Sequence, residues 1–308
     1  MENQKKSEHS VNKIERRKFM KWMAIGTAAI ASIPMLSGCR IDKIEKFFQK
    51  HFKELDADEL KAILAQMEKD YKEKYNVDFK VTSTPPLKDV LFGYGLDLSL
   101  CTGCRQCVYA CVKENNQSVN PQIQWIRVLE MKKEDGVDLL KSNAYYDSSK
   151  VPDPAHFYMP IQCHQCKNPP CTKVCPVQAT WSEPDGIVVV DYNWCIGCRC
   201  CMAACPYSAR HFNWAEPVIP VSAMNTNVEY LGNRPRYKGV VEKCTFCIQR
   251  VRQGKYPACV EACPVGARKF GNLLDEKSEI RLMMKNKKVF ILKKELNTQP
   301  SFFYFYTA

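Results

Sequence analysis

Sixteen of the 18 cysteines fall into four groups of four, and their spacing predicts one kind of metal chemistry. The groups are Cys101, Cys104, Cys107 and Cys111; Cys163, Cys166, Cys171 and Cys175; Cys195, Cys198, Cys201 and Cys205; and Cys244, Cys247, Cys259 and Cys263. Three closely spaced cysteines wrap one loop around three iron corners of a cubane, while the fourth usually ligates the other cluster of a pair. The cysteines therefore predict four [4Fe-4S] clusters.

The four groups differ in the lengths of their loops and in the residue after the last cysteine. The third follows the bacterial ferredoxin run C-x2-C-x2-C-x3-C-P without departure and ends in Cys205-Pro206. The second widens one step to four residues, and the fourth places eleven residues between its second and third cysteines. The first ends in Cys111-Val112 and lacks the proline. All four keep three residues before the last cysteine, so each is compatible with a cluster.

The gap between the second and third groups indicates which groups share clusters. Pro184-Asp185-Gly186 is a turn signal, and the apolar run that ends at Val190 predicts a strand. One short hairpin between two cysteine runs is the layout of a two-cluster ferredoxin module, so groups two and three pair, and groups one and four are left as partners. The predicted ligand sets are set 1 (Cys101, Cys104, Cys107, Cys263), set 2 (Cys163, Cys166, Cys171, Cys205), set 3 (Cys195, Cys198, Cys201, Cys175) and set 4 (Cys244, Cys247, Cys259, Cys111).

Three other uses of cysteine were weighed against this interpretation. A disulfide scaffold suits an exported protein, but disulfide frameworks do not repeat the C-x2-C-x2-C-x3-C spacing. Structural zinc uses two C-x2-C pairs for each tetrahedral site, which suits part of the fourth group and fits the other three poorly. A [3Fe-4S] cluster needs a missing ligand, and no group lacks one.

The predicted fold class is α+β, with two nested bacterial-ferredoxin-like dicluster modules, loop-rich insertions and an N-terminal helical extension. The inner module covers residues 160–215 and lies within the four-cluster domain, residues 91–275. A helical extension and linker, 39–90, precede this domain, and a tail, 276–308, follows it. The stretch 206–243 is an insertion that either covers clusters or meets another subunit.

The extension has a helical pattern of apolar residues. Asp56 and Asp58 can cap a helix, since the apolar residues after them recur at steps of three and four: Leu60, Ile63, Leu64, Met67 and Tyr71. A second apolar set precedes it, which makes an α-hairpin reasonable: Ile41, Ile44, Phe47, Phe48 and Phe52. This extension either packs on the domain as a tether or docks a partner.

The N-terminus, residues 1–38, is twin-arginine in form. Arg16-Arg17 precedes an apolar stretch from Trp22 to Leu36, which is too short to be a confident membrane span. The stretch ends in a lipobox-like Leu-Ser-Gly-Cys, so we predict that Cys39 is the lipidated first residue of the mature chain. The alternative is an ordinary cleavage or none. We expect export to the periplasmic face of the cytoplasmic membrane, with a lipid anchor.

The net charge of +12 would normally favour nucleic acid or anionic membranes. Four clusters subtract roughly eight charges, at about −2 each, so the loaded protein is only mildly basic and no nucleic-acid partner is expected. Basic residues inside or beside the ligand loops are candidates for offsetting cluster charge: Arg105, Lys167, Lys173, Arg199, Arg250, Arg252 and Lys255. Some of them are equally well explained as solvated loop residues.

Little in the chain predicts catalysis. His164 lies between two ligands and is better explained as a loop residue near a cluster than as a base. Cys200 lies between Cys198 and Cys201 and is expected to be a buried thiol that points away from the cluster. No phosphate-binding glycine loop, flavin or nicotinamide fingerprint, or Ser-His-Asp constellation is evident.

Six segments around the cysteines carry a family resemblance: Cys163-His-Gln-Cys-Lys-Asn-Pro-Pro-Cys171, Asp185-Gly-Ile-Val-Val-Val-Asp191, Cys195-Ile-Gly-Cys198, Ala204-Cys-Pro-Tyr207, Lys243-Cys-Thr-Phe-Cys247 and Pro257-Ala-Cys-Val-Glu-Ala-Cys-Pro264. Over residues 92–275 the chain resembles the four-cluster iron–sulfur subunits of the dimethyl sulfoxide reductase family. Similar subunits serve nitrite, polysulfide and tetrathionate reductases, a membrane hydrogenase and the sulfite-reduction-associated membrane complex. The tail from Lys288 to Phe305 is similar to the family's closing strand segment.

The resemblance implies the crossed ligation, a catalytic oxidoreductase subunit at one end, often with molybdopterin, and a quinone-reactive integral membrane subunit at the other. We therefore expect an electron-transfer subunit of a membrane-associated respiratory oxidoreductase complex, without substrate chemistry of its own. An enzyme acting at an open iron is one alternative, and full ligation of all four sites argues against it. A free periplasmic ferredoxin-like carrier or a redox sensor is another, for which one or two clusters would be enough.

Overall fold

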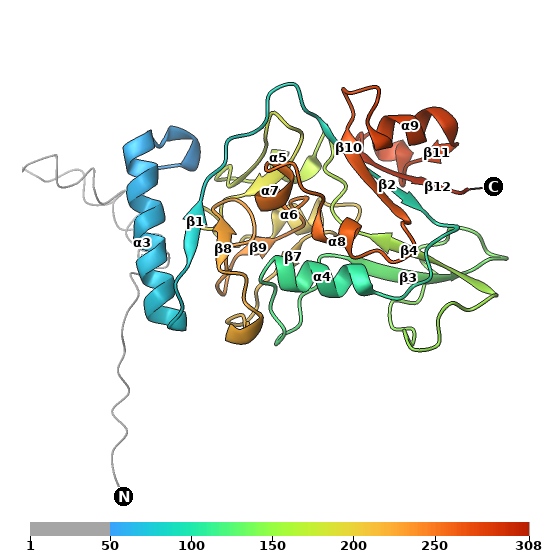
Figure 1. Cartoon of the computed structure of the whole chain (residues 1–308), viewed down its shortest axis with the longest axis horizontal. Coiled ribbons are helices and arrows are strands. Elements are labelled where there is room, and N and C mark those ends of the chain that lie inside the picture. Colours follow the sequence, from blue (N-terminus) through green and yellow to red (C-terminus); the bar gives the residue numbers. More distant parts are fainter. Residues whose placement is uncertain (1–49, 308) are drawn as a thin grey trace, which may run out of the picture. The chain divides into compact units, whose positions relative to one another are not determined.

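The computed structural model describes residues 50–307, in which short helices and short strands alternate (Figure 1). The strands are β1 (Lys80–Thr82), β2 (Phe92–Asp97), β3 (Arg127–Lys132), β4 (His156–Ile161), β5 (Thr180–Ser182), β6 (Val188–Val190), β7 (His211–Phe212), β8 (Asn227–Glu229), β9 (Val241–Glu242), β10 (Arg268–Asn272), β11 (Val289–Phe290) and β12 (Phe302–Phe305). The α-helices are α3 (Ala57–Tyr75), α4 (Gln106–Glu114), α5 (Pro170–Lys173), α6 (Cys200–Ala203), α7 (Ile248–Val251), α8 (Ala258–Glu261) and α9 (Glu279–Asn286). Single 3-10 turns are η1 (Phe52–Glu54), η2 (Val221–Ala223) and η3 (Lys294–Leu296).

Helix α3 of the extension begins with a reciprocal cap. The Asp56 Oδ1 accepts from the N–H of Glu59 at 2.8 Å, and the Glu59 Oε2 accepts from the N–H of Asp56 at 3.1 Å. This capping box satisfies two N–H groups that the first turn would leave unpaired, and it confirms the prediction that Asp56 caps the helix. Most of the preceding apolar set lies outside the described residues, so the α-hairpin stays a prediction.

Four strands form the largest sheet, in the order β10-β2-β12-β11. Strand β2 pairs antiparallel with β10 and parallel with β12, and its Tyr94 and Leu96 are fully buried. Helix α9 packs on β2 and β10 through Ile280 and Met283, where Gly95 leaves room for both side chains. Because β12 pairs with β2, the C-terminal segment completes the sheet, and the predicted closing strand is confirmed.

Four two-stranded ribbons form the other sheets of the described chain. Strands β5 and β6 are the predicted hairpin, which turns at Gly186, where φ is +82°. Strands β7 and β9 pair antiparallel at the two ends of the 206–243 insertion, so the chain leaves and returns at one point. Strand β3 pairs antiparallel with β4, and β1 pairs parallel with β8.

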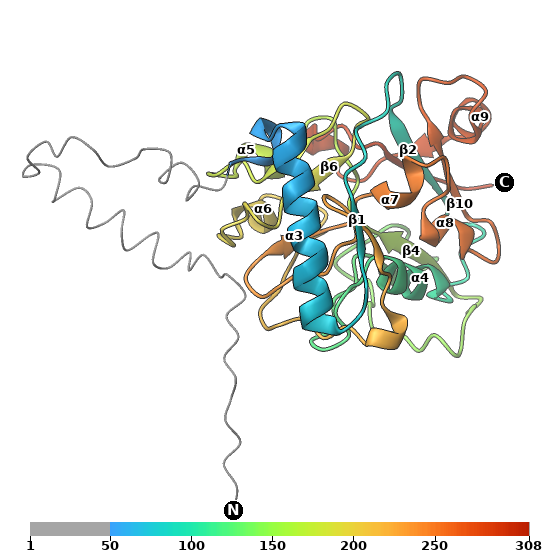
Figure 2. The same ribbon diagram turned by 60° about the vertical axis from the view of Figure 1, so that its left-hand side comes forward.

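Four of the short helices pack in two pairs. Helix α4, from the first cysteine group, contacts α8, from the fourth, and both views show them near each other (Figures 1 and 2). Helix α5, from the second group, contacts α6, from the third. Short helices beside small sheets agree with the predicted α+β, ferredoxin-like class. The helix pairs follow the predicted pairing of the cysteine groups.

Candidate metal centres

The four ligand loops share one backbone feature, a left-handed residue directly before the second cysteine. The φ values are +75° at Gly103, +45° at Gln165, +73° at Gly197 and +54° at Phe246. At Gly197 a Cβ would lie only 2.2 Å from the carbonyl oxygen of Gly239, so a side chain there meets both backbone strain and a clash. The shared conformation indicates that the loops are structural repeats of one another.

The thiols of set 1 line one cavity. Cys101, Cys104 and Cys107 reach it from the first ligand loop, and Cys263 reaches it from the end of α8. The cavity encloses about 340 Å³, part of it open to solvent, and its other walls are mostly apolar. Four sulfur ligands from two distant segments thus surround one space.

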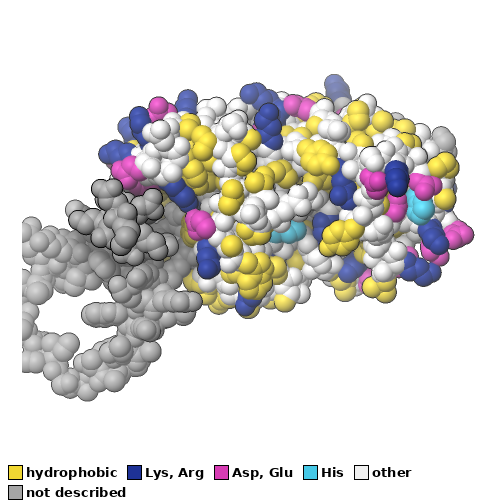
Figure 3. Space-filling view, turned by 90° about the horizontal axis from the view of Figure 1, so that it is seen from below, with side chains coloured by type: hydrophobic (Ala, Val, Ile, Leu, Met, Phe, Trp, Pro, Cys, Tyr) yellow, Lys and Arg dark blue, Asp and Glu magenta, His cyan; other side chains and the backbone are white. Residues whose placement is uncertain are grey.

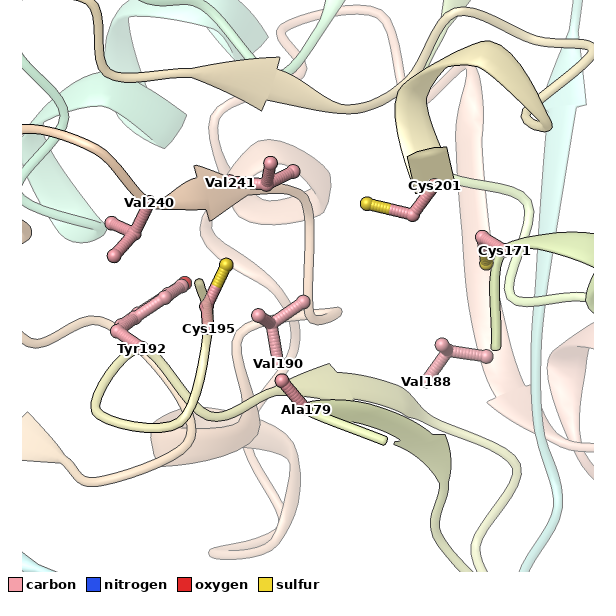
Figure 4. Close-up of a cluster of buried hydrophobic side chains, with 9 residues drawn as sticks. All are labelled: Cys171, Ala179, Val188, Val190, Tyr192, Cys195, Cys201, Val240 and Val241. Atoms are coloured by element: carbon pink, nitrogen blue, oxygen red, sulfur yellow. The ribbon is translucent and has the colours of Figure 1, made fainter. Parts of the chain in front are cut away.

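The thiols of set 3 line a second cavity of nearly the same size, about 330 Å³. Figure 4 shows the thiols of Cys195 and Cys201 directed toward a common space that is bordered by Val190 and Val241. Cys198 and Cys175 line the same cavity, the latter from the second group. Each of the two cavities is therefore lined by four cysteines from two different groups.

The thiols of set 4 are all buried. Burial raises the pKa of Cys111 well above its usual range, and negative charge on Cys247, Cys244 and Cys259 raises it further. The Asn115 Nδ2 also lies 3.5 Å from the Sγ of both Cys111 and Cys247. The last cysteine of the first group therefore lies among those of the fourth.

The thiols of set 2 also influence one another. Burial raises the pKa of Cys166 to about 12, and the charges of Cys163, Cys171 and Cys205 act in the same direction. Neutral thiols are poor ligands, but a bound metal deprotonates a coordinating thiol outright. The structure thus brings together the members of all four predicted sets.

Neighbouring sets lie close in a definite order. The Arg268 guanidinium donates to the Cys107 Sγ of set 1 and to the Tyr94 hydroxyl, which lies 3.3 Å from the Cys259 Sγ of set 4. Gln165, in the ligand loop of set 2, donates to the carbonyl oxygen of Cys244 of set 4 at 2.8 Å. Cys171 of set 2 packs in one buried cluster with Cys195 and Cys201 of set 3. The sets are therefore arranged in the order 1, 4, 2, 3.

The surroundings of these thiols fit cubane clusters. No three or more His, Cys, Asp or Glu side chains within residues 50–307 are grouped so that they could hold a single metal ion. A cubane instead takes four thiolates spread around the corners of a cube. The Arg210 Nη2 donates to the Cys171 Sγ at 2.9 Å, while its buried Nη1 has no hydrogen-bond partner. An N–H left over beside a ligand thiol suits a cluster sulfide as acceptor.

Two arginines that contact ligand thiols were missed by the sequence reasoning. The Arg268 Nη2 donates to the Cys107 Sγ at 3.0 Å, as Arg210 does to Cys171. Each arginine stands five residues after the last cysteine of its group, in a repeated C-P-x-x-A-R. That repeat was a signal available in the sequence.

Several basic residues singled out for their place in the chain have other partners. The Arg252 Nε pairs with the Asp185 carboxylate at 2.8 Å, and the Arg250 Nη1 pairs with Glu114 at 3.3 Å. Arg105 donates to a backbone carbonyl and lies over the ring of Tyr146. Arg250 and Arg252 thus form ion pairs with protein carboxylates, while Arg105 also lines the cavity of set 1.

Two other expectations concerned residues inside ligand loops. The prediction that Cys200 is buried is wrong, because its thiol is exposed: α6 begins there at the surface and turns the side chain outward. His164 is buried between the rings of Tyr207 and Phe302, and burial lowers its pKa to about 3. It is therefore a packed loop residue, as its position suggested.

The helices and one face of the described residues were also compared with the expected membrane association. Within residues 50–307, no helix has both the length and the apolar character needed to cross a bilayer. The face in Figure 3 carries acidic as well as basic side chains, with apolar side chains in separate patches. The twin-arginine segment and Cys39 lie outside the described residues.

Comparison with known proteins gives a consistent result. The model of the 4Fe-4S dicluster domain matches residues 154–238 and 233–273. The iron–sulfur subunit assigned to a dimethyl sulfoxide reductase of Halobacterium salinarum is 43% identical over 213 residues, which cover 69% of this chain and 78% of that protein.

Two further relatives are similar in extent. An iron–sulfur subunit of an Hdr-like menaquinol oxidoreductase of Archaeoglobus fulgidus is 38% identical over 238 residues, covering 68% of this chain and 81% of that protein. The iron–sulfur cluster-binding subunit of a Nitratidesulfovibrio vulgaris menaquinone reductase is 37% identical over 243 residues, covering 70% of this chain and 88% of that protein.

Proposed function

Because the chain belongs to the iron–sulfur subunits of the dimethyl sulfoxide reductase family and carries [4Fe-4S] clusters, we propose that it conducts electrons inside a respiratory complex. The two ends of this conductor would meet a quinone-reactive integral membrane subunit and a catalytic oxidoreductase subunit, often one with molybdopterin. The chain itself would convert no substrate.

The four crossed sets hold the clusters in this proposal, with two nested modules as their frame. Each cluster supplies a centre that takes up and releases one electron at a time. The contact of α4 with α8 and of α5 with α6 supports the nesting, since each helix pair joins two groups that exchange a ligand. The protein's part is to fix the thiolates, to exclude water from set 4, and to tune the potentials.

The observation that supports the proposal most directly is the row of sets in the order 1, 4, 2, 3. Each set is linked to the next through hydrogen bonds or through packing of its ligand cysteines. A carrier with one exchangeable electron needs one or two clusters and no such row. Four clusters in sequence suit transfer between two partners that lie too far apart for a single step.

Both ends of the row include cysteines that are not buried. Set 3 includes the exposed Cys198, beside Ile196, which is 48% exposed, and the Arg199 guanidinium lies over the ring of Trp214, which is 63% exposed. At the other end, set 1 opens to solvent, and Leu100 beside it is 43% exposed. We propose that partners exchange electrons at these two ends.

The membrane location belongs to the same proposal. The twin-arginine form of the N-terminus suits a protein that folds around its clusters before export, and a lipid on Cys39 would hold it at the periplasmic face of the membrane. Labelling with radioactive palmitate tests this, because wild type should take up label and Cys39→Ser should not.

The main test uses the complex extracted in detergent with a tagged chain. We expect a membrane subunit and a redox catalyst to co-purify, and a menaquinol analogue to reduce the clusters as followed by EPR. Cys244→Ser removes a ligand in the middle of the row, so the catalyst should then lose electron supply while the cluster nearest the donor is still reduced. A protein recovered only as a lone monomer would favour the free carrier instead.

A further inference from the structure

Six Lys and Arg side chains are buried within the described residues, and they fall into two classes. Arg234, Arg236 and Arg252 pair with the buried carboxylates of Asp191, Glu242 and Asp185. Arg210, Lys243 and Arg268 have no carboxylate within ion-pair distance in the structure of residues 50–307. A buried cation without a counter-charge is costly, so these three sites require a source of negative charge.

Arg268 lies between sets 1 and 4. Its Nη2 donates to the Sγ of Cys107 at 3.0 Å, and its Nη1 donates to the hydroxyl oxygen of Tyr94 at 2.7 Å. The Tyr94 hydroxyl lies 3.3 Å from the Sγ of Cys259, a member of set 4. The side chain thus reaches one set directly and the next through one hydroxyl group.

Arg210 holds the equivalent place between sets 2 and 3. Its Nη2 donates to the Sγ of Cys171 and to the hydroxyl oxygen of Thr180, both at 2.9 Å. Arg210 also lines the cavity that the thiols of set 3 surround, so the same side chain borders both sets. Its Nη1 is the buried donor without a partner.

Lys243 lies between sets 4 and 2. Its side chain is fully buried, and its Nζ donates to the carbonyl oxygen of Cys244 at 2.7 Å and to the Gln165 Oε1 at 3.4 Å. Gln165 belongs to the ligand loop of set 2, and Cys244 belongs to set 4. Each gap in the row therefore contains one buried cation.

We propose that Arg268, Lys243 and Arg210 are the counter-charges of the cluster row and raise the reduction potentials of the clusters on either side of them. The inference rests on the proposed function, since it requires clusters in all four sets. Reduction adds one electron to a cluster, and the guanidinium stays protonated in both states. A fixed positive charge stabilises the more negative, reduced state, and N–H donors to the ligand sulfurs act in the same direction.

The test is a redox titration with dithionite of the full chain, purified anaerobically and followed by EPR. In Arg210→Gln, the reduction potentials of two clusters should fall by at least about 59 mV. For a one-electron couple this is a tenfold shift of the equilibrium toward the oxidised form. Arg268→Gln should shift two other clusters. Arg210→Lys keeps the charge and should restore most of the wild-type potential.

The matched control is Lys173→Gln, which removes the same charge from the ligand loop of set 2, but from an exposed side chain where solvent screens it. Unchanged potentials in Arg210→Gln, or an equal shift in the control, would overturn the inference. If Arg210→Gln loses iron, the iron content and the potentials of Arg210→Lys are the test. Because this variant keeps the positive charge, it should hold about sixteen irons and have wild-type potentials. Wild type with far fewer irons would instead count against the proposed function.

Discussion

Replacing Cys111 by Ser tests the crossed ligation directly. Cys111 stands in the first cysteine group but lies, fully buried, among Cys244, Cys247 and Cys259 of the fourth. Loss of its thiolate should disturb the cluster of set 4 and spare the cluster held by the rest of the first group. Serine is the suitable replacement because its oxygen can accept the hydrogen bond that Gln117 donates to the Cys111 Sγ at 3.1 Å.

The expected size of the effect follows from the ligand count. Four cubanes give about sixteen irons for each polypeptide, so losing one cluster leaves about twelve, and losing a single corner leaves about fifteen. The hydrogen bond from Gln117 contributes only about 0.5 to 1.5 kcal/mol, and serine keeps it, so general unfolding should not accompany the loss. A selective defect in one cluster is therefore the prediction.

Potential-resolved EPR identifies which cluster has changed if two reference variants are measured beside it. Cys247→Ser removes a ligand of set 4 from the fourth group, and Cys104→Ser removes a ligand of set 1 from the first group. The spectrum of Cys111→Ser should match that of Cys247→Ser. A match to Cys104→Ser would show that each group holds its own cluster and would refute the crossed assignment.

Three further substitutions probe the surroundings of the clusters. Cys200→Ser should keep about sixteen irons and an unchanged EPR spectrum, because this exposed thiol is the one spare cysteine among the described residues, and any loss of iron would contradict that. Gly197→Ala should lose the cluster of set 3, because its Cβ would lie 2.2 Å from a backbone oxygen. Gly254→Ala is the matched control, since Gly254 has a similar φ of +76° but no atom within 4 Å of an added Cβ, and this variant should keep its iron. Glu242→Ala should lower the free energy of unfolding by about 3 to 5 kcal/mol, measured with denaturant, because it leaves Arg236 buried without its partner at 2.7 Å.

The four cysteine groups were recognisable because the spacing within each group is a local signal, whereas the crossed ligation stays a prediction. A loop around a cube fixes the spacing of three ligands, and the short β5–β6 hairpin limits where the fourth can come from. The capping residue Asp56 was predictable for the same reason, since its partner Glu59 is three residues away. Both predictions rest on neighbours in sequence.

Cys200 shows where local reasoning fails. Its two neighbouring ligands make a buried position reasonable, since most free thiols are buried. Arg199, however, adopts a left-handed conformation with φ of +65° and starts α6 at the surface, so the next side chain turns outward. The depth of a ligand loop depends on what covers it, and the spacing of the cysteines carries no information about that.

Some basic residues near the clusters have partners that nearness in sequence does not predict. Arg252 follows the fourth group's first pair of cysteines but points to Asp185, which is 67 residues away. Arg268 lies on β10, which pairs with β2, and this strand pairing carries its guanidinium to Cys107. Such placements depend on the sheet order.

The 206–243 insertion is the clearest case in which contacts near the clusters depend on the pairing of distant strands. Its Arg236 donates to the carbonyl oxygens of Asn115 at 2.6 Å and Asn116 at 2.7 Å, directly after the helix that carries Cys111. Glu242, where β9 closes the insertion, holds the same arginine in place. Since Asn115 also contacts two thiols of set 4, the insertion stabilises the end of α4 that presents Cys111 to the cysteines of the fourth group. Partners about 120 residues apart meet only because β7 and β9 bring the two ends of the insertion together, and the polar composition of the insertion does not predict that closure.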